Sequence, residues 1–171
     1  MDDIVRAAMA KWPNVPDCFG WLGLDARGNW YMRDDRTQAR GPFPDSKGSL
    51  LQHDKLIEFI HRNYAADEHG RWFFQNGPQR VFVELEATPW VWRLQPDGRV
   101  LSHTGLEAHM QDSLLDESGR LYLVTDLGLG LVHTADMAAA AERVEAGDWR
   151  PAVMPHDQMP AHFGFMRRPQ A

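Results

Sequence analysis

The chain has 171 residues, 43% of them hydrophobic and 25% charged, which suits one domain or two small subdomains with a real core and excludes a disordered chain. Its formal net charge of −6 argues against a broad nucleic-acid or anionic-membrane surface, because both usually need a basic face. A single cysteine, Cys18, and the lack of a signal peptide or membrane-length apolar run indicate a cytoplasmic protein without an internal disulfide.

The first half of the chain predicts two helices and two strand pairs. Prolines end the first helix, Gly28 joins the first strand pair, and Asn76-Gly77 is typical of a tight hairpin turn. Residues 33–49 are polar and rich in glycine and proline, so we expect a mobile loop with few contacts. The predicted elements are a helix ending near Trp12, strands 19–25 and 29–32, a helix over 53–64, and strands 71–75 and 79–86.

The second half predicts two further strand pairs and one helix. Thr134 caps that helix, which runs to about Glu145, and Gly147 ends it. The predicted strands are 90–94 with 100–103, and 121–125 with 129–133. Residues 148–171 are proline-rich and lack periodicity, so this C-terminal arm either docks in extended form or stays disordered.

Four short stretches share one pattern, with glycine in fourth place and a strand after it: DARG, DEHG, QPDG and DESG. A side chain such as Asp caps a turn of this kind, and glycine adopts the positive φ that the turn requires. We therefore expect Gly28, Gly70, Gly98 and Gly119 to lie in turns that join or start strands. The alternating ligand pattern of a calcium loop is missing.

These elements predict an α+β fold, built mainly from antiparallel β-hairpins in one or two sheets with two or three helices. The domain is expected to cover residues 1–147. The order of elements also fits an internal repeat of an α+β motif, with halves at about 18–86 and 90–146.

The stretches KWPNVPDCFGWLGLDARGNW, HDKLIEFIHRNY, DEHGRWFFQNGPQRVFVELEATPWVWRL and HTGL resemble a family of uncharacterised proteobacterial proteins. The resemblance covers about residues 10 to 135, and FFQNGPQRV with TPWV is its most specific part. It implies no activity, cofactor or catalytic residue. The order of the motifs is also similar, more loosely, to a second uncharacterised bacterial family. That similarity implies repeated α+β motifs and a role in signal transduction.

Strand 79–86 offers the one candidate for acid–base catalysis. Glu84 and Glu86 are two residues apart on one face, a spacing that permits a paired acid and base. A glycosidase-like hydrolase would use this pair, with Trp90 and Trp92 as sugar-stacking surfaces. The alternative is a solvent-facing polar row paired with neighbouring arginines, and outward faces of half-buried sheets favour it.

Other chemistry has weaker support. The eight histidines show no metal-ligand spacing. Cys18 stands beside Phe19 at the start of an apolar strand, where a buried, inert thiol is the common case. Gly128 and Gly130 fall inside a hairpin, with no helix or lysine to make a phosphate loop. We predict no metal, no cofactor and no catalytic residue.

The number of tryptophans is higher than a core of this size needs. The chain has seven, and exposed aromatic surfaces commonly mark binding sites. We predict an aromatic-lined groove that binds a partner protein or a small ligand. The predicted binding residues are Trp90, Trp92, Arg80, Arg93 and Glu84.

Overall fold

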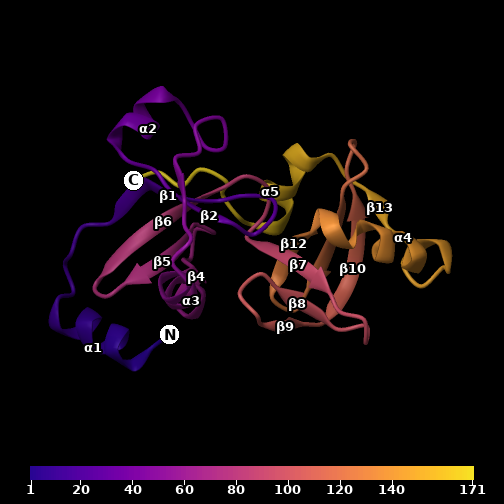
Figure 1. Ribbon diagram of the computed structural model, residues 1–171, viewed down its shortest axis with the longest axis horizontal. Helices are drawn as coiled ribbons and strands as arrows, with labels where there is room; N and C mark the ends of the chain where they lie inside the picture. Colours follow the sequence, from indigo (N-terminus) through magenta and orange to yellow (C-terminus); the bar gives the residue numbers. More distant parts are fainter. The chain divides into compact units, whose positions relative to one another are not determined.

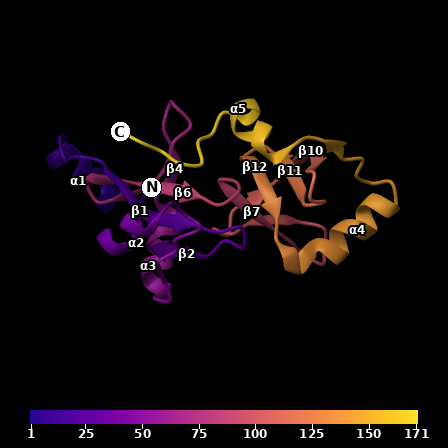
Figure 2. The same ribbon diagram turned by 90° about the horizontal axis from the view of Figure 1, so that it is seen from above.

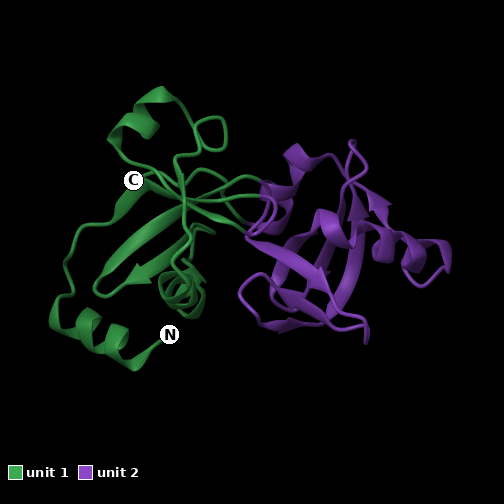
Figure 3. Ribbon diagram, viewed as in Figure 1, with its two compact units in different colours: residues 1–25, 29–86, 165–171 green, residues 26–28, 87–164 purple.

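The computed structural model describes residues 1–171, and the contacts within it divide the chain into two compact units (Figure 3). Unit 1 comprises Met1–Asp25, Asn29–Glu86 and Phe165–Ala171, and unit 2 comprises Ala26–Gly28 and Ala87–Gly164. The boundary after residue 86 lies between the two predicted repeat halves. The predicted C-terminal arm contributes to both units.

Unit 1 contains a six-stranded sheet with the order β3-β2-β1-β6-β5-β4. The central strands β1 and β6 are parallel, and every other neighbouring pair is antiparallel. Its elements (Figure 1) are α1 (Asp3–Lys11), β1 (Cys18–Leu24), β2 (Trp30–Met32), α2 (Asp35–Arg40), β3 (Ser49–Leu50), α3 (Asp54–Arg62), β4 (Tyr64–Ala66), β5 (Trp72–Asn76) and β6 (Gln79–Leu85).

Unit 2 contains a seven-stranded sheet with the order β13-β10-β11-β12-β7-β8-β9. The pairs β12–β7 and β10–β13 are parallel, and the others are antiparallel. Its elements are β7 (Trp90–Leu94), β8 (Val100–Ser102), β9 (Glu107–Ala108), β10 (Met110–Leu115), β11 (Leu121–Thr125), β12 (Gly128–Val132), η1 (Thr134–Asp136), α4 (Met137–Glu145), β13 (Ala152–Val153), η2 (His156–Gln158) and α5 (Met159–Phe163).

The two sheets have the same strand order once β13 is set aside. Unit 1 reads β3-β2-β1-β6-β5-β4 and unit 2 reads β9-β8-β7-β12-β11-β10, so each strand corresponds to the one six places later. The parallel pair occupies the same central position in both sheets. The predicted α+β class with mainly antiparallel hairpins in two sheets is therefore confirmed.

The repeated glycine turns are formed as predicted. The four glycines all have positive φ angles: 83° at Gly28, 76° at Gly70, 89° at Gly98 and 79° at Gly119. In each turn the backbone N–H of the first residue donates to the carbonyl of the fifth, at 2.8 to 3.1 Å. A fifth turn of the same design runs from 102 to 106, with serine in place of aspartate, and the sequence pattern did not identify it.

Residues 33–49 make more contacts than the sequence indicated. The segment contains α2, whose first turn is capped by the Asp34 side chain, and it buries Arg33 and Phe43, both 1% exposed. The Arg33 guanidinium donates to three backbone carbonyls and pairs with Glu84 at 3.3 Å. The expectation of a contact-poor loop is corrected, because a buried cation and a buried ring anchor the segment.

The C-terminal arm docks on the rest of the chain. In unit 2, β13 pairs with β10 (Figure 1), and Met159 of α5 is buried. In unit 1, Phe165 is buried and the carbonyl of Arg167 accepts from Leu85 N–H at 2.8 Å. None of the helices is both long and apolar enough to cross a membrane.

Candidate binding site

The structure places the two predicted groove tryptophans in the core of unit 2. Trp90 and Trp92 are 5% and 0% exposed, and Val91 between them is 1% exposed. Both indole N–H groups donate to backbone carbonyls, Trp90 to Leu127 at 2.8 Å and Trp92 to Leu123 at 3.1 Å. An accessible aromatic surface is therefore not formed at this pair, because residues on both faces of β7 are buried.

Two other predicted binding residues are engaged in structural ion pairs. Glu84 pairs with the buried Arg33 and also accepts from the backbone N–H of Phe43 at 3.2 Å. Arg93 pairs with Asp136 at 2.8 Å. These contacts tie segments of one unit together, so we assign neither residue to ligand binding.

Arg80, the fifth predicted residue, lines a cavity of ≈ 340 Å³ in unit 1. Its guanidinium lies over the ring of Phe73 at 4.5 Å. No carboxylate forms an ion pair with it; its charge is available for a ligand.

The cavity lies between the end of α1 and the β5–β6 hairpin. Figures 1 and 2 both show α1 beside the tip of this hairpin, and a Cβ atom on Gly77 would lie 4.0 Å from Ala8. The segment that follows α1 supplies Trp12, Pro13, Val15 and Asp17, α1 itself supplies Met9, and the hairpin supplies Gln75, Pro78 and Arg80.

Hydrogen bonds hold both walls of the cavity in place. At the start of α1, Asp2 N–H donates to the Asn63 side chain at 2.9 Å, and the Asp2 carboxylate pairs with Arg62. Beyond α1, the carbonyl of Pro16 accepts from the Gln79 side chain at 3.0 Å. The segment formed by α1 and the loop that carries Trp12 is thus fastened at both ends to the rest of unit 1.

Trp12 gives the cavity an accessible aromatic wall. The side chain is 50% exposed, and the ammonium of Lys11 lies 4.7 Å from the centre of its ring. A partly exposed indole offers a large apolar area at low conformational cost, which suits ligand recognition.

Gln75 lines the same cavity and carries a buried acceptor without a partner. The residue is 1% exposed, and its side-chain nitrogen donates to the Gly77 carbonyl at 3.0 Å. Because a carbonyl can only accept, the nitrogen must face Gly77, and Oε1 is the atom without a hydrogen bond. A buried acceptor left in this state ordinarily costs about 1–3 kcal/mol.

Asp17 adds the opposite charge. It lines the cavity on the loop side, its side chain is exposed, and it forms neither an ion pair nor a hydrogen bond. The cavity therefore holds one unpaired cation and one unpaired anion that do not neutralise each other.

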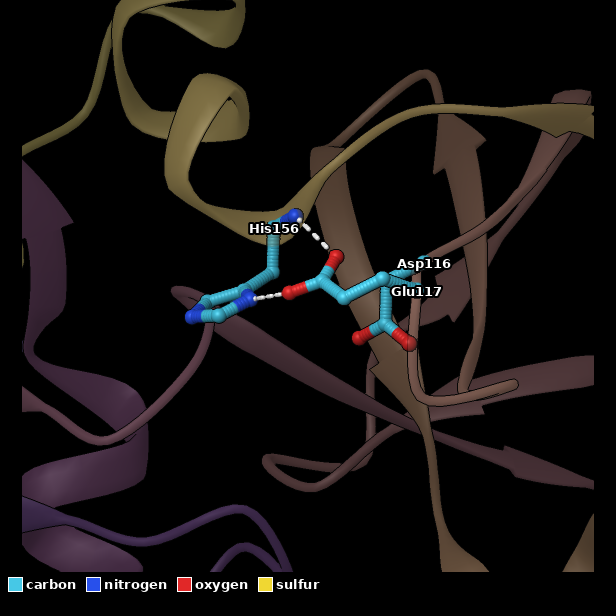
Figure 4. A group of neighbouring side chains, drawn as sticks. All are labelled: Asp116, Glu117 and His156. Carbon is cyan, nitrogen blue, oxygen red and sulfur yellow. Dashed lines mark hydrogen bonds and ion pairs between the residues drawn. The ribbon is translucent and has the colours of Figure 1, made fainter.

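A second group of residues has the composition of a metal site. Figure 4 shows Asp116, Glu117 and His156, whose potential ligand atoms lie within 4.8 Å of one another. The backbone N–H of His156 donates to Glu117 at 2.9 Å, and the imidazole Nδ1 contacts the same carboxylate. The other ring nitrogen faces Asp157 at 2.9 Å.

The hydrogen bonds of Asp116 argue for a turn instead of a metal. Its carboxylate accepts from two backbone N–H groups, from Arg120 Nε at 3.0 Å and from the Tyr122 hydroxyl at 2.6 Å. Burial alone would raise the pKa of Asp116, but these hydrogen bonds outweigh burial and lower it. Asp67, in the matching turn of unit 1, binds Arg71 in the same way. A metal ion would have to displace these donors.

Unit 2 has two further cavities, of ≈ 390 and ≈ 580 Å³, which share Arg143 and Trp149. Each cation there already has a carboxylate partner: Arg143 with Asp148, Arg99 with Asp97, and His109 with Asp126. Because these charges are satisfied within the protein, we take the unit 1 cavity as the candidate site.

Sequence comparison identifies the family. Residues 1–170 match the model of the family DUF2944, described as "Protein of unknown function (DUF2946)", and the chain belongs to this family. The predicted membership of an uncharacterised family is confirmed. No curated protein matches the chain.

Two solved structures are similar to this one. A DUF1285 family protein from Silicibacter pomeroyi DSS-3 is 12% identical, with 83% of this chain and 84% of that chain covered at a TM-score of 0.52. A DUF1285 family protein from Shewanella baltica OS155 is 18% identical, with 76% and 97% covered at a TM-score of 0.48. At these identities the first similarity shows the fold alone, and the second carries no argument. The function must be argued from the site.

Proposed function

We propose that the protein is a non-catalytic binding module that takes up a small ligand in the unit 1 cavity lined by Trp12 and Arg80. The predicted aromatic-lined groove is thereby moved from Trp90 and Trp92 to Trp12, while Arg80 keeps its predicted role.

One observation carries this proposal: two groups of opposite charge that line a single cavity have no ion-pair partner in the protein. They are the Arg80 guanidinium and the Asp17 carboxylate. Their combination beside an exposed indole is typical of a recognition site, where a few polar groups orient a ligand between apolar walls.

The size of the cavity favours a small ligand over a partner protein. Its volume of ≈ 340 Å³ lies at the lower end of the range for small-molecule sites, about 300–1,000 Å³. The hydrolase alternative lacks comparable support, because Glu84 is held by Arg33 and by the Phe43 N–H group.

We further propose that the two units are copies of one α+β motif. The equal strand orders support this, and so do the matching turns after β1 and β7 and after β4 and β10. A cytoplasmic location is supported by the single free cysteine, Cys18. A role in signalling, which the resemblance implies, is compatible with a module that binds a ligand without transforming it.

Thermal unfolding with a collection of small metabolites tests the proposed function. At least one compound should raise the Tm of the wild-type chain, since a ligand at 100 times its Kd stabilises by about 2.7 kcal/mol. Trp12→Ala and Arg80→Gln should abolish most of that rise. Trp21→Ala removes another indole of unit 1, 36% exposed, and should preserve it. A compound that raises the Tm of the wild type and of all three variants equally would contradict the proposal.

A further inference from the structure

We propose that the ligand of the unit 1 cavity is a free α-amino acid with an apolar side chain. This inference rests on the proposed function and names its ligand class. The amino acid's carboxylate would bind Arg80, and its ammonium would bind Asp17.

The charges of the cavity define the first requirement. Arg80 and Asp17 both line it, and neither has an ion-pair partner. A guanidinium presents a planar set of donors that matches a carboxylate. The stacking of Arg80 on Phe73 at 4.5 Å restricts the orientation of that plane. A zwitterion satisfies both charges at once, whereas a purely anionic or cationic ligand leaves one of them unpaired.

The carboxylate of the cavity defines the second requirement. Asp17 lines the cavity and is exposed, and its carboxylate can only accept hydrogen bonds. A primary ammonium carries three N–H donors that this carboxylate can accept. A quaternary ammonium has none, so betaine-like zwitterions do not fit.

The walls define the third requirement. Apart from Arg80, Asp17 and Gln75, the lining residues are apolar or aromatic: Met9, Trp12, Pro13, Val15 and Pro78. One face of the Trp12 ring is occupied by Lys11, which leaves the other face for contact with the ligand side chain. These walls favour an aliphatic or aromatic side chain over a polar one.

Isothermal titration calorimetry on the full chain tests this ligand class, with L-leucine and L-phenylalanine as probes. Three comparison compounds each lack one recognised feature: 4-methylpentanoate has no ammonium, 3-methylbutylamine has no carboxylate, and glycine has no side chain. Each should bind at least tenfold more weakly than L-leucine, because one set of contacts is lost.

Variants make the test specific to the cavity. Arg80→Gln and Asp17→Asn should each weaken L-leucine at least tenfold, and Asp17→Asn should leave the residual affinity for 4-methylpentanoate unchanged. The matched controls are Asp35→Asn and Arg36→Gln, which alter exposed residues of α2 and should have no effect.

The outcomes separate the two proposals. Amino acids that fail to bind, while another metabolite binds in a Trp12-dependent manner, would overturn the ligand class and leave the proposed function standing. Binding of L-leucine that the Arg80 and Asp17 variants do not change would also overturn this inference. If no compound binds at the cavity, both proposals are wrong.

Discussion

At the residue scale, His61 is a half-buried imidazole that the fold keeps neutral. Its Nε2 accepts a hydrogen bond from the indole N–H of Trp30 at 2.8 Å, so this nitrogen cannot carry a proton. Burial lowers the pKa of His61 from 6.5 to about 4. Protonation would break this hydrogen bond and place a charge at a half-buried position, so unit 1 would lose stability.

The sign of the pH dependence follows from this pKa. Between pH 6.5 and about 4 the unfolded state binds the proton that the folded state refuses, so the free energy of unfolding falls as the pH falls. We expect a loss of about 2 kcal/mol across this range after allowance for solvent screening. Urea unfolding at several pH values, on wild type and on His61→Gln, measures it. Equal pH slopes for the two proteins would show that His61 does not titrate in this way.

At the element scale, the 33–49 segment packs tightly against β1 at Gly23. The side chain of Phe43 lies over Gly23, where a Cβ atom would come within 2.6 Å of the ring. Gly23 has no positive φ, so the glycine is required for space alone. The segment occupies the position between β2 and β3 that the short 102–106 turn occupies between β8 and β9.

Gly23→Ala should therefore destabilise the protein by about 1–3 kcal/mol through overpacking. Phe43→Leu should relieve part of this cost, so the double variant should be more stable than the sum of the two single effects predicts. Urea unfolding of the four proteins completes the cycle. Strict additivity would show that Phe43 does not pack on Gly23.

Some elements were predictable from the sequence because their determinants are local. A glycine in fourth place sets a positive φ whatever surrounds it, so Gly28 and Gly70 were placed correctly. The burial of Trp90 and Trp92 was not predictable, because it depends on β12, which pairs with β7 from about 40 residues further along. Alternation with a period of two shows which residues share a face of a strand. It does not show whether that face is exposed or buried.

The candidate site was only partly predictable for the same reason. Arg80 was a candidate from its place on a strand, but Asp17 and Trp12 come from a segment that only the fold brings to the hairpin. Gln75 stands directly before the Asn76-Gly77 turn, where a polar residue is ordinary. No local pattern signals that its Oε1 lacks a partner.

At the scale of the whole molecule, the chain leaves unit 1 after residue 86 and returns to it for its last residues, Phe165–Ala171. Within unit 1, this returning segment buries Phe165. Three hydrogen bonds also join it to the rest of unit 1. The N–H of Leu85 donates to the carbonyl of Arg167, and the N–H of Met166 donates to the carbonyl of Gly70. The Arg71 side chain donates to the carbonyl of Gln170. It therefore acts as a structural part of unit 1.

Truncation after Gly164 should weaken unit 1 selectively. We expect faster hydrogen–deuterium exchange in peptides covering 70–76 and 81–86, because their contacts with the returning segment are lost. Peptides covering 121–132 of unit 2 serve as the internal control and should not change. Uniform acceleration in both units would contradict the assignment of the segment to unit 1.

The most direct test of the central claim is an NMR titration that follows the indole N–H signals of the seven tryptophans, assigned by single Trp→Phe variants. Addition of L-leucine should shift the Trp12 signal and the side-chain amide signals of Gln75. The signals of Trp90 and Trp92 should stay in place, because both indoles are buried in unit 2. If Trp90 or Trp92 shifts while Trp12 does not, the binding site lies elsewhere and the account given for the unit 1 cavity is wrong.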